Sequence, residues 1–303
     1  MRSDALAFVV VACASACGPA RAPSGGTVHV VGTRSDSTQQ EAGELARAIV
    51  LGSVTITLRI DALRAHPFAA GLMRMGGLQK TFDLAGIDAL EEIDRAFIAS
   101  PNASSCRTAI VIRHHMSSAR VDEAFELART RSEPPGARVD GLGFPAVIVT
   151  IGKQRRILAA PLRDHLLVLP ENDAPRAGEL SSSRGLDAGG DTAAFVLHAQ
   201  PEAWTPFPPI FPYGIRSADA WIALDAGGAR GTVELFDDSN DDARDDAAVI
   251  DADVHEAIRT KLLGLDVDLL HMRWWSSGDR VRGTASLGSA ALRALLLVPF
   301  DRC

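Results

Sequence analysis

The sequence predicts an α+β protein built from two tandem related units, each with the element order βαββαβ. Three observations support this prediction. Short segments rich in Val, Ile and Thr alternate as half-buried strands do. Amphipathic segments with helical spacing lie between them. Similar segments then recur in the same order in the second half of the chain. The 303 residues are 47% hydrophobic and 23% charged, which provides enough apolar surface for a sizeable core.

The first predicted unit spans residues 53–170. It opens with a strand in which β-branched residues alternate, and a helix through His66 and Leu72 follows. Two strands then flank a polar loop, and a helix from about Ser117 to Arg131 places its apolar residues on one face. A closing hairpin turns at Gly152. The expected strands are Val54–Ile60, Ala96–Ala99, Thr108–Ile112, Ala146–Ile151 and Ile157–Leu169, and the helix stripe is Val121, Ala124, Phe125 and Ala128.

The second predicted unit spans residues 191–303 and repeats this order. Ala220 lies 124 residues after its match Ala96, and Asp242 lies 124 residues after its match Ser118. The remaining strands of this unit are expected at Ala193–Ala199, Gly231–Leu235 and Leu295–Pro299. The order βαββαβ is that of the split βαβ, ferredoxin-like arrangement, so each unit is expected to form an antiparallel sheet of that type. Because this fold serves many unrelated functions, it does not predict one here.

Two segments lie outside the units, one between them and one before the first. Residues 171–190 are rich in Pro, Ser and Gly and are expected to be a linker. Residues 17–52 are expected to hold another linker and a short helical lead-in. In that lead-in, Ser37 and Gln40 have the spacing of a capping box.

The amino-terminal residues resemble the signal peptide of bacterial lipoprotein precursors. An apolar run of twelve residues, Ala5–Ala16, ends in Ala14-Ser15-Ala16-Cys17, where small residues precede a cysteine as they do in the lipobox of that family. The resemblance implies that residues 1–16 are removed and that Cys17 is lipidated, which would anchor the protein to a membrane of the bacterial cell envelope. Gly18 follows in place of the Asp associated with inner-membrane retention, so the resemblance slightly favours the outer membrane.

The other cysteines allow one disulfide in an oxidising envelope. After loss of Cys13 with the signal peptide and lipidation of Cys17, Cys106 and Cys303 remain. A bond between them is one hypothesis, and two independent thiols are the alternative.

The least ordinary stretch is Trp204–Tyr213, which reads WTPFPPIFPY. Its four prolines prevent a helix, so it is either an aromatic surface for a partner or apolar ligand, or an irregular cover packed on the second sheet. Consecutive strand residues face opposite sides, so of Trp274 and Trp275 one is expected in the core and the other on the far face. The candidate surface residues are Trp204, Phe207, Phe211, Tyr213, Trp274 and Trp275.

The motifs of common enzymes and metal sites are missing from the sequence. There is no G-x-S-x-G, H-E-x-x-H or C-x-x-C, and the adjacent His114 and His115 would point to opposite faces of a strand. The acidic run Asp237–Glu256 is read as a solvated helix start, with weak cation binding as the alternative. No catalytic residue, metal or cofactor is therefore predicted, and the formal charge of −7 argues against nucleic acid as a partner.

These observations predict a lipid-anchored, non-enzymatic binding or scaffolding module of the envelope. The alternative is a carrier of an apolar ligand, which would use the aromatic stretch and Trp274 or Trp275 to line a groove. A third, weaker hypothesis is an enzyme whose site forms only in three dimensions, with Asp61, His66, Arg113 and His114 as first candidates.

Overall fold

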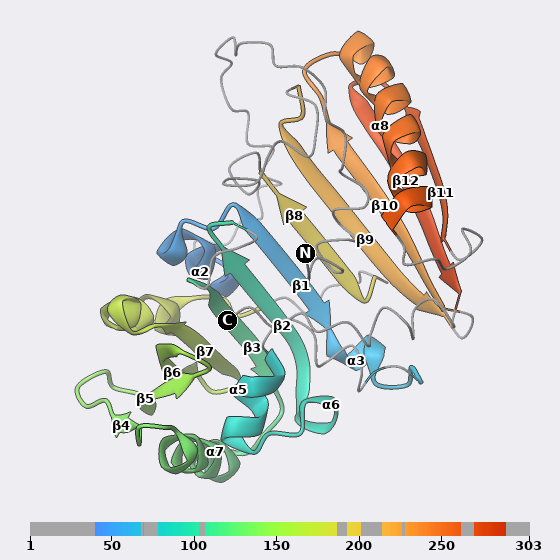
Figure 1. The fold of residues 1–303 in the computed structure, drawn as a ribbon. Coiled ribbons are helices and arrows are strands. Elements are labelled where there is room, and N and C mark those ends of the chain that lie inside the picture. The colour runs from blue at the N-terminus through green and yellow to red at the C-terminus, as the bar shows by residue number, and fades with distance from the viewer. Residues whose placement is uncertain are drawn as a thin grey trace.

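Twelve strands form a single antiparallel sheet in the computed structural model, with the order β11-β12-β10-β9-β8-β1-β2-β3-β7-β6-β5-β4 (Figure 1). The structure describes residues 40–67, 69, 78–102, 107–186, 193–200, 214–225, 228–261 and 270–288. The strands are β1 (Val54–Arg59), β2 (Ile93–Ser100), β3 (Ala109–His114), β4 (Ala137–Arg138), β5 (Ala146–Ile151), β6 (Gln154–Leu162), β7 (His165–Pro170), β8 (Phe195–Ala199), β9 (Ser217–Asp225), β10 (Gly228–Phe236), β11 (Leu270–Ser276) and β12 (Arg280–Gly288).

Helices cover both faces of the first half of the sheet. On one face, α2 (Ala42–Val50) packs on β2 and β3, and the 3₁₀ helix η2 (Glu171–Ser182) packs on β6 and β7. On the other face lie α5 (Leu78–Ala85) and α7 (Ser118–Arg131), with the short helices α3 (Ile60–Leu63) and α6 (Ala89–Glu92) near the start of β2. A buried apolar cluster fills the space on each side, which makes this half a three-layer structure.

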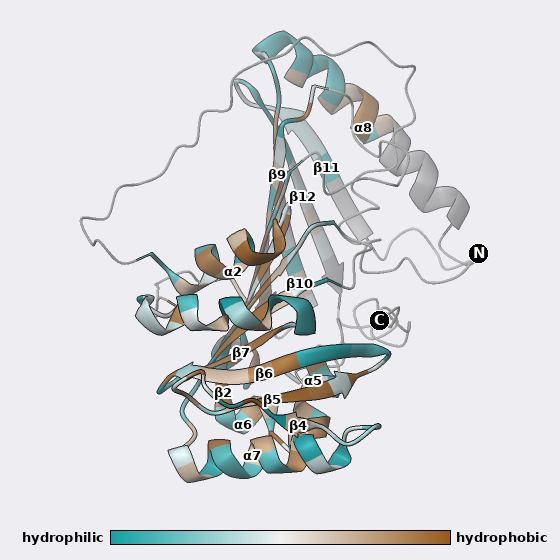
Figure 2. Ribbon diagram, turned by 90° about the vertical axis from the view of Figure 1, so that its left-hand side faces the viewer, coloured by the Kyte–Doolittle hydropathy of each residue, from teal (hydrophilic) through white to brown (hydrophobic). Residues whose placement is uncertain are grey.

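One long helix, α8 (Asn240–Lys261), covers the second half of the sheet. It packs on β11 and β12 over a core that includes Leu235, Ile250, Trp274 and Val281. Figure 2 shows α8 on one side of the sheet and α2 on the other.

The two halves meet where β1 pairs with β8 in antiparallel register, with Val54 opposite Ala199 and Leu58 opposite Phe195. Val54 and Ala199 are buried at this junction. The ferredoxin-like prediction is therefore wrong. A split βαβ unit places two parallel strands side by side, whereas every pairing between described strands is antiparallel. The two halves also share one sheet instead of forming a separate sheet each.

The order of elements nevertheless recurs in the two halves. Strands β1, β2 and β3 followed by α7 correspond in order to β8, β9 and β10 followed by α8. The strand orders run outward in a matching way from the β1–β8 pair, as β1-β2-β3-β7-β6 on one side and β8-β9-β10-β12-β11 on the other. In this matching, β12 lies beside β10 as β7 lies beside β3. The sequence comparison instead matched Leu295–Pro299 with β7, and these residues lie outside the described part of the chain.

Local predictions succeed best where periodicity is strong. The helix at Ser118–Arg131 begins after the N-cap Ser117, and its predicted apolar stripe is the buried one. The single strand expected at Ile157–Leu169 is instead the end of β6 and most of β7, separated by a turn at Arg163 and Asp164. Most of the expected linker 171–190 is η2, whose Ala177 and Leu180 are buried. Helix α2 starts after Glu41, with no side-chain cap.

Candidate binding face of the sheet

The two faces of β9–β12 differ in what covers them. Alternation along the strands sends Leu235, Trp274 and Val281 toward α8, where all three are buried. The ring of Trp274 lies against Gly283, where a Cβ atom would come within 2.5 Å of it. The prediction that one of the two adjacent indoles faces the core is confirmed, because Trp274 is 8% exposed and Trp275 is 43% exposed.

The opposite face of β8–β12 carries polar and aromatic side chains, and Figure 2 shows no described helix over it. We call this surface the open face. Cross-strand register arranges its residues in two neighbouring rows. One row is His198, Asp219, Glu234, Arg282 and Trp275; the other is Val196, Trp221, Thr232, Thr284 and Arg273.

Hydrogen bonds hold the first row in place. Glu234 accepts a hydrogen bond from Arg280 at 2.9 Å and forms an ion pair with Arg282 at 3.1 Å, so one carboxylate lies between two guanidinium groups. The Nε atom of Arg282 is buried and has no hydrogen-bond partner. Arg280 also stacks on Phe236, with 4.7 Å between its Cζ atom and the ring centroid. The side chains beside Trp275 are thus preorganised.

A second polar pair lies near the middle of the sheet. The Nδ1 atom of His198 is 2.6 Å from Oδ1 of Asp219. Asp219 lies directly opposite Glu234 across β9 and β10, so the pair continues the polar row toward β1.

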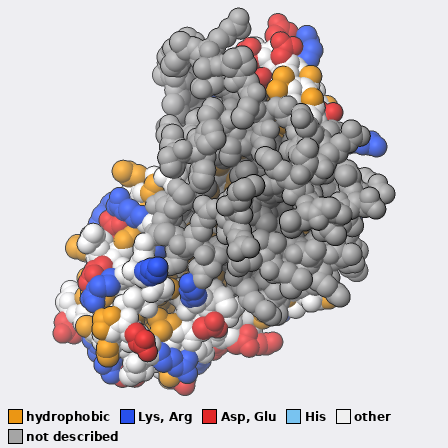
Figure 3. Space-filling view, viewed as in Figure 1, with side chains coloured by type: hydrophobic (Ala, Val, Ile, Leu, Met, Phe, Trp, Pro, Cys, Tyr) orange, Lys and Arg blue, Asp and Glu red, His pale blue; other side chains and the backbone are white. Residues whose placement is uncertain are grey.

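Charge separates across this half of the sheet. Over β10, β12 and β11 the open face carries one carboxylate, Glu234, and four arginines, a formal balance of 4 − 1 = +3; the arginines are Arg230, Arg273, Arg280 and Arg282. Its other described carboxylate, Asp219, lies on β9 and lowers the balance to 4 − 2 = +2 when that strand is included. The start of α8, on the other side, is acidic, and Figure 3 shows red side chains gathered over it at the upper right. A basic surface on a chain with net charge −7 favours an anionic partner.

The other predicted surface and cysteine positions lie outside the described residues. These are Cys17, Cys106, Cys303, Trp204, Phe207, Phe211 and Tyr213. The lipidation and disulfide predictions therefore stay predictions. Sequence reasoning missed Asp219, Glu234 and Arg282, although polar residues at every second position of their strands were a usable signal.

Two of the four residues considered for an enzyme, Asp61 and His114, have separate partners. Asp61 is bonded to Arg59 at 2.9 Å, whereas buried His114 accepts a hydrogen bond from the Met116 N–H at 3.1 Å. Burial, with a smaller contribution from nearby His165, lowers the pKa of His114 to about 4. His165 is also buried and is held by the Asp164 carboxylate and the Leu186 N–H. Both imidazoles are therefore structural, and among the described residues no group of three His, Cys, Asp or Glu side chains is placed to hold a metal ion.

Two aspartates meet where β10 leads into α8. Asp237 is 2% exposed and accepts a hydrogen bond from the Asp238 N–H at 2.7 Å. Burial raises its pKa. Burial, followed by the hydrogen bond and charge of Asp237, raises the pKa of Asp246 to about 7. The helix cap itself is Ser239, whose Oγ accepts from the Asp242 N–H at 3.2 Å.

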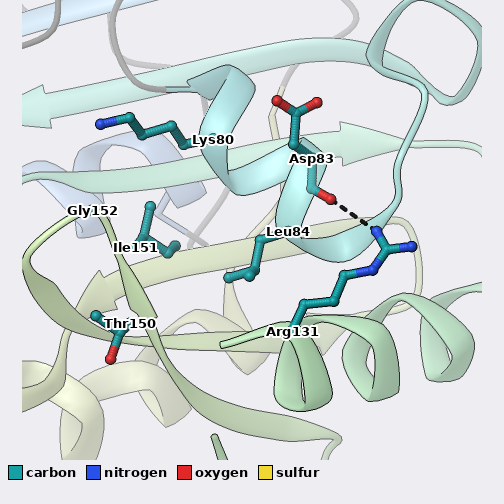
Figure 4. A pocket seen from close by; sticks show the side chains of 7 residues that line it. All are labelled: Lys80, Asp83, Leu84, Arg131, Thr150, Ile151 and Gly152. Atoms are coloured by element: carbon teal, nitrogen blue, oxygen red, sulfur yellow. Dashed lines mark hydrogen bonds between the residues drawn. The ribbon is translucent and has the colours of Figure 1, made fainter. Parts of the chain in front are cut away.

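A cavity of about 360 Å³ lies between α5, the end of α7 and the β5–β6 turn (Figure 4). Its lining residues are Lys80, Asp83, Leu84, Arg131, Thr150, Ile151 and Gly152. Arg131 donates to the Asp83 carbonyl at 3.0 Å, and Gln79 donates to the Asp83 carboxylate at 2.7 Å. Since these charged groups already stabilise the α5–α7 contact, the open face is the better candidate site.

Comparison with known proteins does not identify a family. No family model matches the chain, and no curated protein matches it. Solved structures of TP0453 resemble it, at 9% sequence identity and a TM-score of 0.48 for crystal form I and at 10% and 0.47 for crystal form IV. The form I match covers 82% of this chain and 94% of that chain. At these TM-scores the resemblance supports no functional conclusion. Among the described helices, none is long and apolar enough to cross a membrane.

Proposed function

We propose that this protein is a lipid-anchored, non-enzymatic binding module of the bacterial cell envelope, and that it binds its partner through the open face. The observation that carries the proposal is the exposed Trp275 beside the arginine–glutamate network of Arg280, Arg282 and Glu234. An aromatic ring next to fixed charged groups is typical of binding surfaces, because it combines apolar contact area with directional hydrogen bonds.

The anchor rests on the resemblance of Ala14–Cys17 to a lipobox. An acylated Cys17 would hold the folded part close to a membrane, where a module needs only modest affinity because its partner is locally concentrated. The matching order of elements in the two halves further supports an origin by duplication, in which the second half kept one face of its sheet for binding.

Photo-crosslinking in native envelopes tests the binding role. A photoreactive amino acid replaces Trp275 in one variant and Val249 in another. Val249 is a matched control, because it is 42% exposed but lies on α8, on the other side of the sheet. We expect a discrete crosslinked species from position 275 and none from position 249.

Two outcomes would contradict the proposal. Equal crosslinking from both positions would show that the open face has no special role. A Cys17→Ser variant that still fractionates with membranes, together with a wild-type mass without acyl chains, would remove the anchor.

A further inference from the structure

The open face has a second indole besides Trp275. Trp221 lies in the neighbouring row, three strand spacings away across β10 and β12, which corresponds to about 14 Å. Hydroxyl and charged groups fill the surface between the two rings. Thr232 and Thr284 are exposed in the row of Trp221, and Glu234 and Arg282 lie in the row of Trp275. This is an extended, mostly polar strip with an aromatic ring near each end.

Such a strip suits a saccharide chain better than a lipid bilayer. Proteins that insert into a bilayer surface present several large apolar side chains on one face. On the open face Trp275 is the one large apolar side chain that is highly exposed among the described residues. A sugar ring needs only an aromatic surface against its C–H face, with hydroxyl, carboxylate and guanidinium groups at its edges.

The charge of the strip narrows the class of saccharide. Over β9, β10, β12 and β11 the described side chains of the open face have a formal charge of 4 − 2 = +2, from four arginines and the carboxylates Asp219 and Glu234. Arg273, at the end of the Trp221 row, is exposed and makes no ion pair or hydrogen bond with another described residue. Guanidinium groups bind carboxylates and phosphates in a bidentate manner. An acidic saccharide would therefore find both stacking surfaces and counter-charges here.

We propose that the open face binds an anionic polysaccharide, one whose sugars carry carboxylate or phosphate groups. The chain would cross the strands from Trp221 toward Trp275, with its acidic groups at Arg273 and Arg282. This inference rests on the proposed function, because it names the partner of the same face.

The test measures binding of the purified full-length protein in detergent to polygalacturonate, a soluble polyuronate, in 150 mM salt. Neutral dextran and phosphatidylglycerol vesicles are measured in parallel. The variants are Trp275→Ala and Arg273→Gln, and the matched controls on α8 are Val249→Ala and Arg244→Gln. Circular dichroism and thermal unfolding confirm that each variant is folded.

We expect saturable binding of polygalacturonate and none of dextran. Trp275→Ala should weaken binding by about tenfold, which equals about 1.4 kcal/mol. Arg273→Gln should weaken it by about threefold and lower its salt dependence. The two α8 variants should bind as the wild type does.

Three results would overturn the proposal. The first is that the protein does not bind polygalacturonate. The second is that the α8 variants weaken binding as much as the open-face variants do. The third is that the protein binds only the vesicles and that this binding depends on Trp275. If photo-crosslinking from position 275 still captures a discrete partner, only the saccharide assignment fails. If position 275 also gives no crosslink, the proposed function fails with it.

Discussion

Replacing Asp246 with Asn should stabilise the protein at pH 8 and leave its stability at pH 4.5 nearly unchanged. In the folded protein the pKa of Asp246 is raised from the ordinary 3.8 to about 7, first by burial and then by Asp237. The folded state therefore holds this proton more tightly than the unfolded state does. Its stabilising contribution is fully present below pH 3.8 and is lost as the pH rises through 7.

The size of the effect follows from the pKa. One pKa unit is worth about 1.36 kcal/mol, so the change corresponds to at most about 4 kcal/mol. Because Asp246 is only partly buried, solvent screening reduces this to about 1–2 kcal/mol. Asp238, Asp242 and Asp245 add further negative charge around the pair, so a neutral amide side chain at position 246 relieves repulsion that the wild type carries at high pH.

Urea unfolding followed by tryptophan fluorescence measures this directly. Wild type and Asp246→Asn are compared at pH 4.5 and pH 8, with Asp241→Asn as the control, because the Asp241 side chain is 87% exposed. The variant should gain stability only at pH 8, and the control should follow the wild type at both values. A gain of equal size at both pH values would refute the reasoning, because the effect would then not come from titration of the pair.

Three further predictions concern packing, a partly buried ion pair and a buried imidazole. Gly283→Ala should lower the free energy of unfolding by about 1–3 kcal/mol, because the new methyl group collides with the ring of Trp274. Gly231→Ala should cost less, because its methyl group would meet nothing closer than 3.9 Å. Equal losses for the two variants in chemical denaturation would contradict this prediction. Asp173→Asn should lower the free energy of unfolding by about 1–2 kcal/mol in the same assay, because buried Asp173 accepts hydrogen bonds of 3.0–3.2 Å from Arg107. Glu171→Gln in the same helix should change stability little, because the ion pair between Glu171 and Arg155 is solvated. The wild type should lose more stability than His114→Gln as the pH falls from 6.5 to about 4, because the pKa of His114 in the folded protein lies below its ordinary value. Parallel curves of stability against pH for the two proteins would show that His114 does not cause this loss.

The local structure followed from the sequence where a strong period coincided with burial. The stripe of α7 and the opposite orientations of Trp274 and Trp275 depend only on residue spacing, and both predictions were confirmed. The turn at Arg163 and Asp164 was missed because apolar segments flank it on both sides and were taken as one strand, although these two charged residues interrupt the apolar run.

The sheet topology could not be predicted because it depends on which strands pair. The order of elements is compatible with a split βαβ unit and with antiparallel neighbours, and only the pairing of β1 with β2 and of β2 with β3 decides between them. The open face was predicted in part. One of Trp274 and Trp275 was expected on this face, without a choice between them. The arginines around Glu234 come from β12, beside β10, and their approach is set by cross-strand register.

Hydroxyl-radical footprinting tests the central claim most directly, because it reads Trp275 in the unmodified protein. Oxidation of Trp275 is compared between intact envelopes and the detergent-purified protein, with Val249 on α8 as the internal reference. Binding through the open face predicts that Trp275 is protected in envelopes and reactive after purification, while Val249 reacts equally in both. Equal oxidation of Trp275 in the two preparations would contradict the account.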